Sequence, residues 1–304
     1  MRTKFIVNPM AGSGKCMKHW KTYLKERVSL FPNHEISYTV RPREATDITR
    51  TALRFGFEKI IAVGGDGTLN EVVNGFFEGG ELISPNAFLG MLPLGTGADF
   101  PINFSYPSRK EDIFKVLANK HYKKTDVGKI IYGKIPQKKV GYFINIASFG
   151  CSSEVVVATN KNKKPLGNLS YLTEGVWTFL KAKPKVYSLK KEGQDTVTQY
   201  LSFNVFVANG LSNGGGMKWA PQAQIDDGCF DVIILGQISK WKMPLLIPHI
   251  YKGTVLSNKE VEMFRARKLE VSCEGEMAFE VDGEIMGTLP ATFEILPKCI
   301  NFLC

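Results

Sequence analysis

The stretch EKIIAVGGDGTLNEVVNG, Glu58–Gly75, decides the fold of the first part of this chain. Its apolar run Ile60–Val63 predicts a buried strand of a parallel sheet, because such strands are covered on both faces. After Thr68, apolar residues recur at intervals of three and four residues, which predicts a helix. The glycine-rich segment Gly64–Thr68 therefore lies between the end of a strand and the start of a helix.

This glycine-rich segment has the features of an anion-binding loop. The first N–H groups of a helix have no partner within the helix, and the helix dipole adds positive potential there. Three glycines in four residues let the main chain approach a phosphate without interference from a Cβ atom. The alternative interpretation of the loop alone is a plain Gly/Asp-rich turn of an α/β fold.

Two other glycine-rich stretches do not match known phosphate-binding motifs. In Gly12–Lys15 the first glycine of a P-loop would fall at Pro9, and Cys16 stands where the motif requires serine or threonine. In the stretch that begins at Gly95, Phe100 occupies the third glycine position of a dinucleotide fingerprint. The sequence therefore supports neither a P-loop ATPase nor a dehydrogenase.

Strand-like and helix-like segments alternate over residues 1–126, which predicts a doubly wound α/β domain with a parallel sheet. Ligands of such domains bind at the carboxyl ends of the strands. Asn8-Pro9, Thr39, the GGDGT loop and Gly95-Thr96 all follow predicted strands, so we expect them at one edge of the sheet. Over residues 127–297 the pattern changes to short β-rich runs between Gly, Asn and Asp turns, which predicts an antiparallel β-sandwich.

The charge balance indicates an acidic partner. The 304 residues carry a net charge of +10, and the stretch Thr159–Lys191 holds eight lysines against one acid, Glu174. Aromatic residues near these lysines are too irregularly spaced for a base-stacking platform, so we expect no nucleic acid partner. Six scattered cysteines, no signal peptide and no apolar run of about 18 residues predict a cytoplasmic protein without a membrane span.

The loop sequence GGDGTLNEVVNG resembles the nucleotide loop of the diacylglycerol-kinase catalytic family, which includes bacterial lipid kinases, sphingosine kinases and ceramide kinases. GGDGT alone is shared with NAD kinases, and 6-phosphofructokinases carry a close variant, whereas LNEVVNG is more typical of lipid kinases. Four further stretches of the family occur in the expected order, NPMAGSGK from Asn8, LPLGTGADF from Leu92, APQAQIDDGCFDV from Ala220 and EVDGE from Glu280. Relatives usually carry asparagine where this chain has Ala98, which leaves the details of substrate binding open.

The resemblance covers nearly the whole chain and implies its organisation. It implies a nucleotide-binding α/β domain like that of NAD kinases and phosphofructokinases at 1–126, and a β-sandwich lipid-substrate domain at 127–297. It also implies that residues 298–304 return to the first domain. The cofactors implied are ATP and Mg²⁺.

The resemblance also implies the site residues. Expected contacts with the nucleotide are Asn8, Pro9, Met10, Ala11, Gly12, Thr39, Gly65, Asp66, Gly67, Thr68, Leu69, Asn70, Glu71 and Thr96. The catalytic residues implied are Glu284 as the base, Asp282 beside it, and Asp66, although Asp-Gly is equally a hairpin signal. A structural Mg²⁺ is expected at the side chain of Asp227 and the backbone oxygens of Gln224 and Cys229, since Mg²⁺ prefers oxygen to thiolate.

Together these features predict an ATP-dependent lipid kinase that transfers the γ-phosphate to a lipid hydroxyl, of diacylglycerol or of a sphingoid base. We expect peripheral association with an anionic membrane surface through the lysines 161, 163, 164, 181, 183 and 185. The alternatives are an NAD kinase and a catalytically silent nucleotide-binding module. The sequence leaves the oligomeric state open, a homodimer included.

Overall fold

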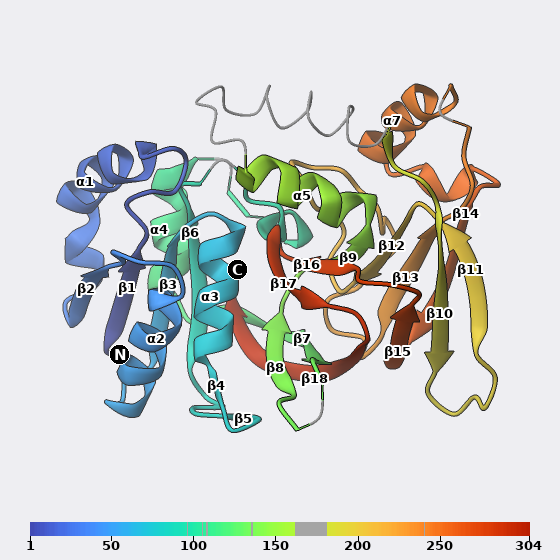
Figure 1. Ribbon diagram of the computed structural model, residues 1–304. Helices are drawn as coiled ribbons and strands as arrows, with labels where there is room; N and C mark the ends of the chain where they lie inside the picture. Colours follow the sequence, from blue (N-terminus) through green and yellow to red (C-terminus); the bar gives the residue numbers. More distant parts are fainter. Residues whose placement is uncertain (96, 105, 108, 135, 162–180, 240) are drawn as a thin grey trace. The chain divides into compact units, whose positions relative to one another are not determined.

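The computed structural model describes residues 1–95, 97–104, 106–107, 109–134, 136–161, 181–239 and 241–304. These residues form two compact units, which we call the first unit, Met1–Asp126 with Lys298–Cys304, and the second unit, Val127–Pro297 (Figure 1). The chain leaves the first unit within strand β7, Tyr122–Tyr132, and re-enters it within strand β18, Ala291–Leu303.

A parallel sheet forms the centre of the first unit. Its strands are β1 (Thr3–Val7), β2 (His34–Tyr38), β3 (Lys59–Gly64) and β6 (Phe88–Pro93), in the order β6-β3-β1-β2. The C-terminal part of β18 adds a further parallel strand beside β6. All six residues of β3 are buried, as the apolar run in its sequence predicts for a strand covered on both faces.

Helices cover both faces of this sheet. On one face α1 (Lys15–Arg27) and α4 (Lys110–Ala118) pack Trp20 and Phe114 against alternate residues of the strands, including Phe5 and Ile61. On the other face α2 (Glu44–Arg54) contacts β1, and α3 (Asp66–Gly75) contacts β3. Shorter elements are η1 (Val28–Leu30), β4 (Phe77–Glu78), β5 (Glu81–Leu82) and η2 (Phe100–Asn103).

The second unit contains an antiparallel sheet in the order β14-β13-β12-β9-β16-β17. Its strands are β9 (Ile146–Gly150), β12 (Asn204–Ala208), β13 (Phe230–Leu235), β14 (Val261–Ala266), β16 (Ala278–Val281) and β17 (Glu284–Thr288). A second group of strands consists of β8 (Lys139–Phe143), β10 (Lys185–Lys191), β11 (Thr198–Ser202) and β15 (Lys268–Cys273), together with parts of β7 and β18.

Aromatic side chains join these two groups of strands face to face. Phe143 of β8 stacks on Phe230 of β13 with ring centroids 5.5 Å apart, and Phe149 of β9 stacks on Phe293 of β18 at 6.1 Å. Both pairs belong to one buried core cluster. The second unit is therefore an antiparallel β-sandwich, and the predicted fold of both parts of the chain is confirmed.

A second layer covers the outer face of the six-stranded sheet. It includes α5 (Cys151–Lys161), α7 (Met243–Lys252) and η3 (Val255–Ser257). Within β12, Val205 and Val207 face the core of the sandwich, whereas Phe206 faces the outer layer and stacks on Trp219 at 4.3 Å. Among the residues described, no helix has the length and apolar character needed to cross a bilayer.

Candidate functional site

The glycine-rich loop of the first unit joins β3 to α3. Strand β3 ends at Gly64, α3 begins at Asp66, and Gly65 between them is the N-cap residue, with no side chain to cap the helix. The first amides of α3 therefore point out of a helix start whose dipole favours an anion. The sequence predicted this strand–loop–helix arrangement.

Close packing explains two of the glycines independently of any phosphate. A Cβ atom on Gly64 would lie 2.4 Å from Oγ1 of Thr68, which is buried in the first turn of α3. A Cβ atom on Gly95 would lie 2.4 Å from Cα of Gly65. The two loops that follow β3 and β6 thus meet backbone to backbone at Gly95, where a larger residue would separate them, whereas a larger residue at Gly64 would displace Thr68.

Asn8 connects the end of β1 to the same loop. Its amide nitrogen Nδ2 donates to Oγ1 of Thr68 at 3.1 Å, and its Oδ1 accepts a hydrogen bond from the backbone N–H of Met10 at 3.0 Å. The backbone N–H of Thr39 donates to the carbonyl of Val7 at 2.9 Å, directly after β2. Asn8, Thr39 and the GGDGT loop therefore lie at one edge of the parallel sheet.

Asp66 connects the start of α3 to the loop after β6. Its carboxylate oxygens accept the backbone N–H of Asp99 at 3.1 and 3.0 Å, and Oδ1 also accepts that of Phe100 at 3.3 Å. These hydrogen bonds fix the loop after β6 against the start of α3. In this structure Asp66 is a loop-positioning residue, since its carboxylate is held by the backbone N–H groups of Asp99 and Phe100.

Three of the other expected nucleotide contacts have side chains that are buried or already hydrogen-bonded within the protein. Glu71 accepts the backbone N–H of Arg43 at 2.9 Å and that of Ala45 at 3.1 Å, so its carboxylate stabilises the start of α2. The Leu69 side chain is fully buried, and Asn70 is buried against Asn74 in α3. Both leave only backbone atoms for a ligand.

Other members of the expected set lie on the surface or in the turn after β1. Met10 is 76% exposed, Ala11 packs against the core of the first unit, and Gly12 has a positive φ of 63°. Pro9 is half-buried beside Asn8, and Gly67 is half-buried in the first turn of α3. Thr96 lies outside the described residues.

The second unit carries the predicted acidic turn. Asp282 and Gly283 form the two-residue turn of the β16–β17 hairpin, with φ values of 48° and 87°. Positive φ at both central residues is the geometry that favours Asp-Gly in hairpins. Glu284 follows as the first residue of β17 and is exposed.

Asp282 is anchored to the backbone of a neighbouring segment. Its Oδ2 accepts the N–H of Ile144 at 3.1 Å, and its Oδ1 accepts those of Asn145 and Ile146 at 3.1 and 3.0 Å. The residue is 4% exposed. These three hydrogen bonds fix the position of the turn, and with it the start of β17 at Glu284.

Glu280 is a further acidic residue of this hairpin that sequence reasoning did not select. Its Oε2 accepts the N–H of Gly283 at 2.9 Å, while Oε1 accepts hydrogen bonds from the hydroxyl of Ser148 and from Nδ2 of Asn213. Burial raises the pKa of Glu280 to about 7, an effect to which the nearby Asp282 carboxylate adds. The available signal was a glutamate between the apolar residues Phe279 and Val281 of a predicted strand, because charged residues are rarely buried without a reason.

Of the expected Mg²⁺ ligands, Asp227 is paired with an arginine. Oδ1 of Asp227 accepts the N–H of Cys229 at 3.0 Å, and its Oδ2 is paired with the guanidinium of Arg265. The Arg265 Nε also lies 3.3 Å from Oδ1 of Asp231. Gln224 is exposed.

The donor set at Asp227 does not form a ready Mg²⁺ site, because a guanidinium already neutralises the carboxylate. In the described part of the chain, no group of three or more His, Cys, Asp or Glu side chains is placed to hold a metal ion. Oδ2 of the buried Asp231 has no hydrogen-bond partner among the described residues, and burial raises the pKa of this carboxyl group. The Arg265 guanidinium is thus shared between these two carboxylates.

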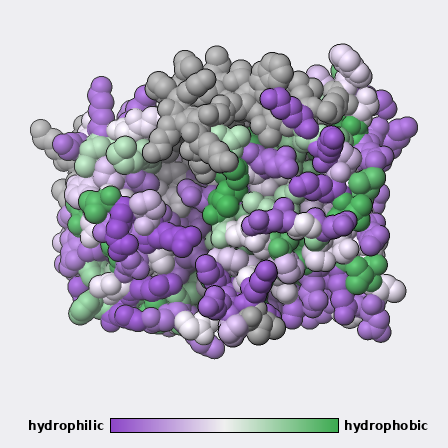
Figure 2. Space-filling view, in the orientation of Figure 1, coloured by the Kyte–Doolittle hydropathy of each residue, from purple (hydrophilic) through white to green (hydrophobic). Residues whose placement is uncertain are grey.

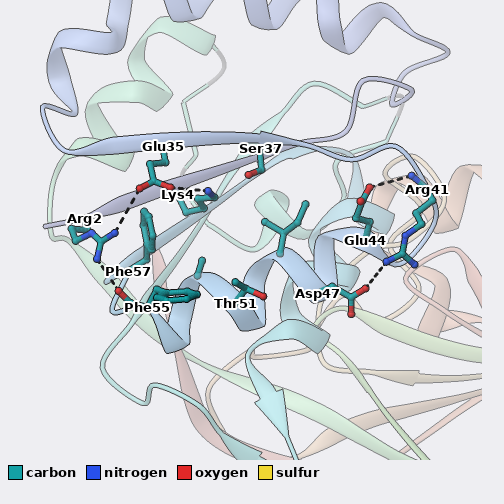
Figure 3. A pocket seen from close by; sticks show the side chains of 12 residues that line it. Arg2, Lys4, Glu35, Ser37, Arg41, Glu44, Asp47, Thr51, Phe55 and Phe57 are labelled. Carbon is teal, nitrogen blue, oxygen red and sulfur yellow. Dashed lines mark hydrogen bonds and ion pairs between the residues drawn. The ribbon is translucent and has the colours of Figure 1, made fainter.

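A separate pocket of about 490 Å³ lies between β1, β2 and α2 of the first unit (Figure 3). Its charged side chains pair with one another, Lys4 with Glu35 at 3.0 Å and Arg41 with Asp47 at 3.0 Å. The residues that line it do not include those of the GGDGT loop. Because acids and bases balance within it, this pocket does not have the character of a phosphate site.

Two family models match the chain. Residues 2–130 match the diacylglycerol kinase catalytic domain, and residues 145–304 match the YegS C-terminal NAD kinase beta sandwich-like domain. A diacylglycerol kinase of Staphylococcus haemolyticus is 32% identical over 265 residues, which cover 86% of this chain and 76% of the relative. The chain belongs to the diacylglycerol kinase family.

Solved structures show the same fold. A proposed diacylglycerol kinase from Bacillus anthracis superimposes with a TM-score of 0.79 at 24% identity, over 99% of this chain and 94% of that one. A yeast NADH kinase in complex with NADH superimposes with a TM-score of 0.53 at 11% identity, over 99% of this chain and 82% of that one. At such identities these likenesses concern the fold alone.

Proposed function

We propose that this protein is a lipid kinase that transfers the γ-phosphate of ATP to a lipid hydroxyl, that of diacylglycerol or of a sphingoid base. Membership of the diacylglycerol kinase family supports a kinase. The observation that carries the proposal is the glycine loop between β3 and α3, which presents uncapped helix amides at the carboxyl edge of a parallel sheet.

In this proposal residues 1–126 form the nucleotide-binding domain, and the loop amides bind the phosphates of ATP. Asn8 and Thr68 hold the ends of β1 and α3 in register through their 3.1 Å hydrogen bond, and Asp66 positions the loop after β6. Leu69, Asn70 and Glu71 contribute through the backbone or by stabilising the loop, because their side chains are engaged elsewhere. Residues 298–304 belong to the same domain.

Residues 127–297 form the lipid-substrate domain, with Glu284 as the general base. As the lipid oxygen attacks the γ-phosphorus, the Glu284 carboxylate takes the hydroxyl proton, a new P–O bond forms, and the bond to the leaving ADP breaks. Asp282 and Glu280 position this base, since both hold the turn that precedes it. Exposure of Glu284 supports this role, because a base must be reachable by the substrate.

We propose Mg²⁺ as the companion of ATP, where the ion would offset the charge of the phosphates. A structural Mg²⁺ bound by Asp227 and the carbonyls of Gln224 and Cys229 would have to displace the Arg265 guanidinium from Asp227. We therefore route no step of phosphoryl transfer through that second ion.

We further propose a cytoplasmic protein that associates peripherally with an anionic membrane, because its lipid substrate resides there. Of the lysines expected to make this contact, 163 and 164 lie outside the described residues, as does the side chain of Lys161. Lys185 is paired with Glu154 at 3.7 Å. The contact surface is taken up again below.

The test of the proposed function is the transfer of radiolabelled phosphate from ATP to a panel of lipids, with NAD as a parallel acceptor. The proposal predicts a labelled phospholipid from diacylglycerol or a sphingoid base and unlabelled NAD. Labelled NAD would instead identify an NAD kinase. ATP binding without any labelled acceptor would identify a catalytically silent nucleotide-binding module.

A further inference from the structure

Helix α7, Met243–Lys252, is apolar on its solvent side as well as on its packed side. Leu246 and Ile250 are buried in the outer layer of the second unit. Leu245 is nevertheless 70% exposed, and Trp241, just before the helix, is 90% exposed. A surface helix normally turns polar residues outward, so an apolar outward side requires a separate explanation.

The exposed apolar residues near α7 are concentrated. Four of the fifteen large apolar side chains that are exposed among the described residues fall within eleven positions, namely Trp241, Leu245, Ile247 and Tyr251. Leu245 and Pro248 are three residues apart, which places them on one side of α7, and Trp241 lies in the turn before the helix. We call these five residues the α7 face. Figure 2 shows mainly hydrophilic residues over the visible surface, with apolar residues in small separate patches.

Lysines outnumber acidic residues in the segment that carries the α7 face. The 24 residues from Gly236 to Lys259 include lysines at 240, 242, 252 and 259 and contain neither aspartate nor glutamate. Lys252 and Lys259 are exposed, while Lys242 is paired with Glu260 at 3.2 Å. The surface therefore combines a central apolar strip with a basic rim.

We propose that the α7 face docks this protein on an anionic lipid bilayer. A bilayer offers what this surface lacks, an apolar layer for Trp241 and Leu245 and negative head groups for Lys252 and Lys259. Tryptophan and tyrosine suit the boundary, because each has an apolar ring and one polar group that remains hydrated. Glycine at position 253, with φ 75°, ends α7 and leaves the strip one short helix in length.

A second copy of this chain is a poorer partner for the same surface. In a two-fold contact the α7 face would meet itself, and the basic rims would lie against each other without an acid in Gly236–Lys259 to pair them. Like charges brought together in this way oppose association. Charge complementarity thus favours the anionic bilayer.

This inference extends the proposed function, because a kinase of membrane lipids must reach its substrate at the bilayer surface. It differs from the lysine-based expectation drawn from residues 161–185 by assigning the contact to apolar residues as well as charge. The binding itself needs neither ATP nor turnover. The two proposals can therefore fail separately.

The test is sedimentation of the full-length protein with vesicles of phosphatidylglycerol and phosphatidylcholine, and with vesicles of phosphatidylcholine alone. The variants are Leu245→Glu and Trp241→Ala, both at exposed positions where the fold tolerates change. Val197→Glu is the matched control, since Val197 is a 55% exposed apolar residue of the same unit away from α7. Activity on a water-soluble short-chain diacylglycerol is measured in parallel.

We expect Leu245→Glu to lower the partition coefficient on anionic vesicles by roughly tenfold or more, because a charge replaces an inserted apolar side chain. Trp241→Ala lowers it in the same direction, Val197→Glu leaves it unchanged, and high salt weakens binding of the wild type. Brominated lipids quench the tryptophan fluorescence of the wild type more strongly than that of Trp241→Ala.

Wild-type partitioning of Leu245→Glu would overturn the inference, as would a wild-type dimer that this substitution converts to monomer. Activity of Leu245→Glu on the soluble diacylglycerol should equal that of the wild type. A different result would separate the two proposals. If neither the wild type nor any variant phosphorylates diacylglycerol, but vesicle binding is weakened by Leu245→Glu and Trp241→Ala and not by Val197→Glu, the proposed function is wrong and the docking surface is supported.

Discussion

Replacing Glu280 with glutamine tests why a carboxyl group is buried beside the acidic turn. Glutamine has nearly the same shape, and its oxygen can still accept the N–H of Gly283. Its amide nitrogen can donate to the hydroxyl of Ser148, so the substitution gives up only the 3.3 Å contact with Asn213. The change removes a titratable group and preserves the packing.

The magnitude follows from proton linkage. Burial raises the pKa of Glu280 from its ordinary 4.5 to about 7, so between these pH values the folded protein holds a proton that the unfolded chain has lost. The free energy of unfolding therefore falls as the pH rises through this window, and at higher pH the buried, charged carboxylate destabilises the folded protein. The expected fall between pH 5 and pH 8.5 is about 2–3 kcal/mol.

The assay is urea unfolding of wild type and Glu280→Gln at pH 5 and pH 8.5. The free energy of unfolding of the variant, relative to that of the wild type, should rise by about 2–3 kcal/mol between the two pH values. Glu276→Gln, at an exposed glutamate of the same segment, should show the same pH dependence as the wild type. A Glu280→Gln variant whose difference from the wild type does not change with pH would refute the buried, proton-holding carboxyl group.

Three further substitutions address the loops and the metal. Gly95→Ala should lower the free energy of unfolding by about 1–3 kcal/mol and weaken ATP binding measured by calorimetry, because its Cβ would lie 2.4 Å from Cα of Gly65 in the neighbouring loop. Gly97→Ala is the control and should resemble the wild type, because its Cβ would lie 3.4 Å from Oδ2 of Asp66. Equal effects of the two substitutions would contradict the packing argument. Glu71→Gln should lower the free energy of unfolding in urea by about 1 kcal/mol, because the single carbonyl oxygen of glutamine must replace a carboxylate that accepts two backbone N–H groups at the start of α2. Unchanged stability would exclude that role of Glu71. Asp227→Ala should lower the thermal midpoint, because it removes the ion pair with Arg265, and should leave any stabilisation by added Mg²⁺ unchanged, because that ion pair already occupies the carboxylate; a variant that loses the Mg²⁺ stabilisation of the wild type would place an ion at Asp227.

Local patterns in the sequence predicted the framework of the site. The apolar run before GGDGT and the helical spacing after it located β3, the loop and α3, because each signal lies within a few residues. The Asp-Gly pair likewise predicted the β16–β17 hairpin, which the structure contains, whereas the role of Glu284 as a base stays a prediction.

Contacts between distant residues could not be predicted in the same way. The hydrogen bonds from Asp99 to Asp66 span 33 positions, and those from Asn145 to Asp282 span 137, so no local pattern encodes them. The burial of Glu280 depends on strands β9 and β16 pairing, which gathers Ser148 beside it. The apolar outward side of α7 was also hidden, because an apolar run does not reveal which of its residues face solvent.

The most direct test of the central claim compares wild type and Glu284→Gln in phosphate transfer from radiolabelled ATP to diacylglycerol. ATP affinity is measured by calorimetry on the same samples. We predict that the variant binds ATP as the wild type does and transfers phosphate about 10²–10⁴ times more slowly, the usual cost of losing a general base. Transfer at the wild-type rate by Glu284→Gln would contradict the assignment of this residue as the base of a lipid kinase.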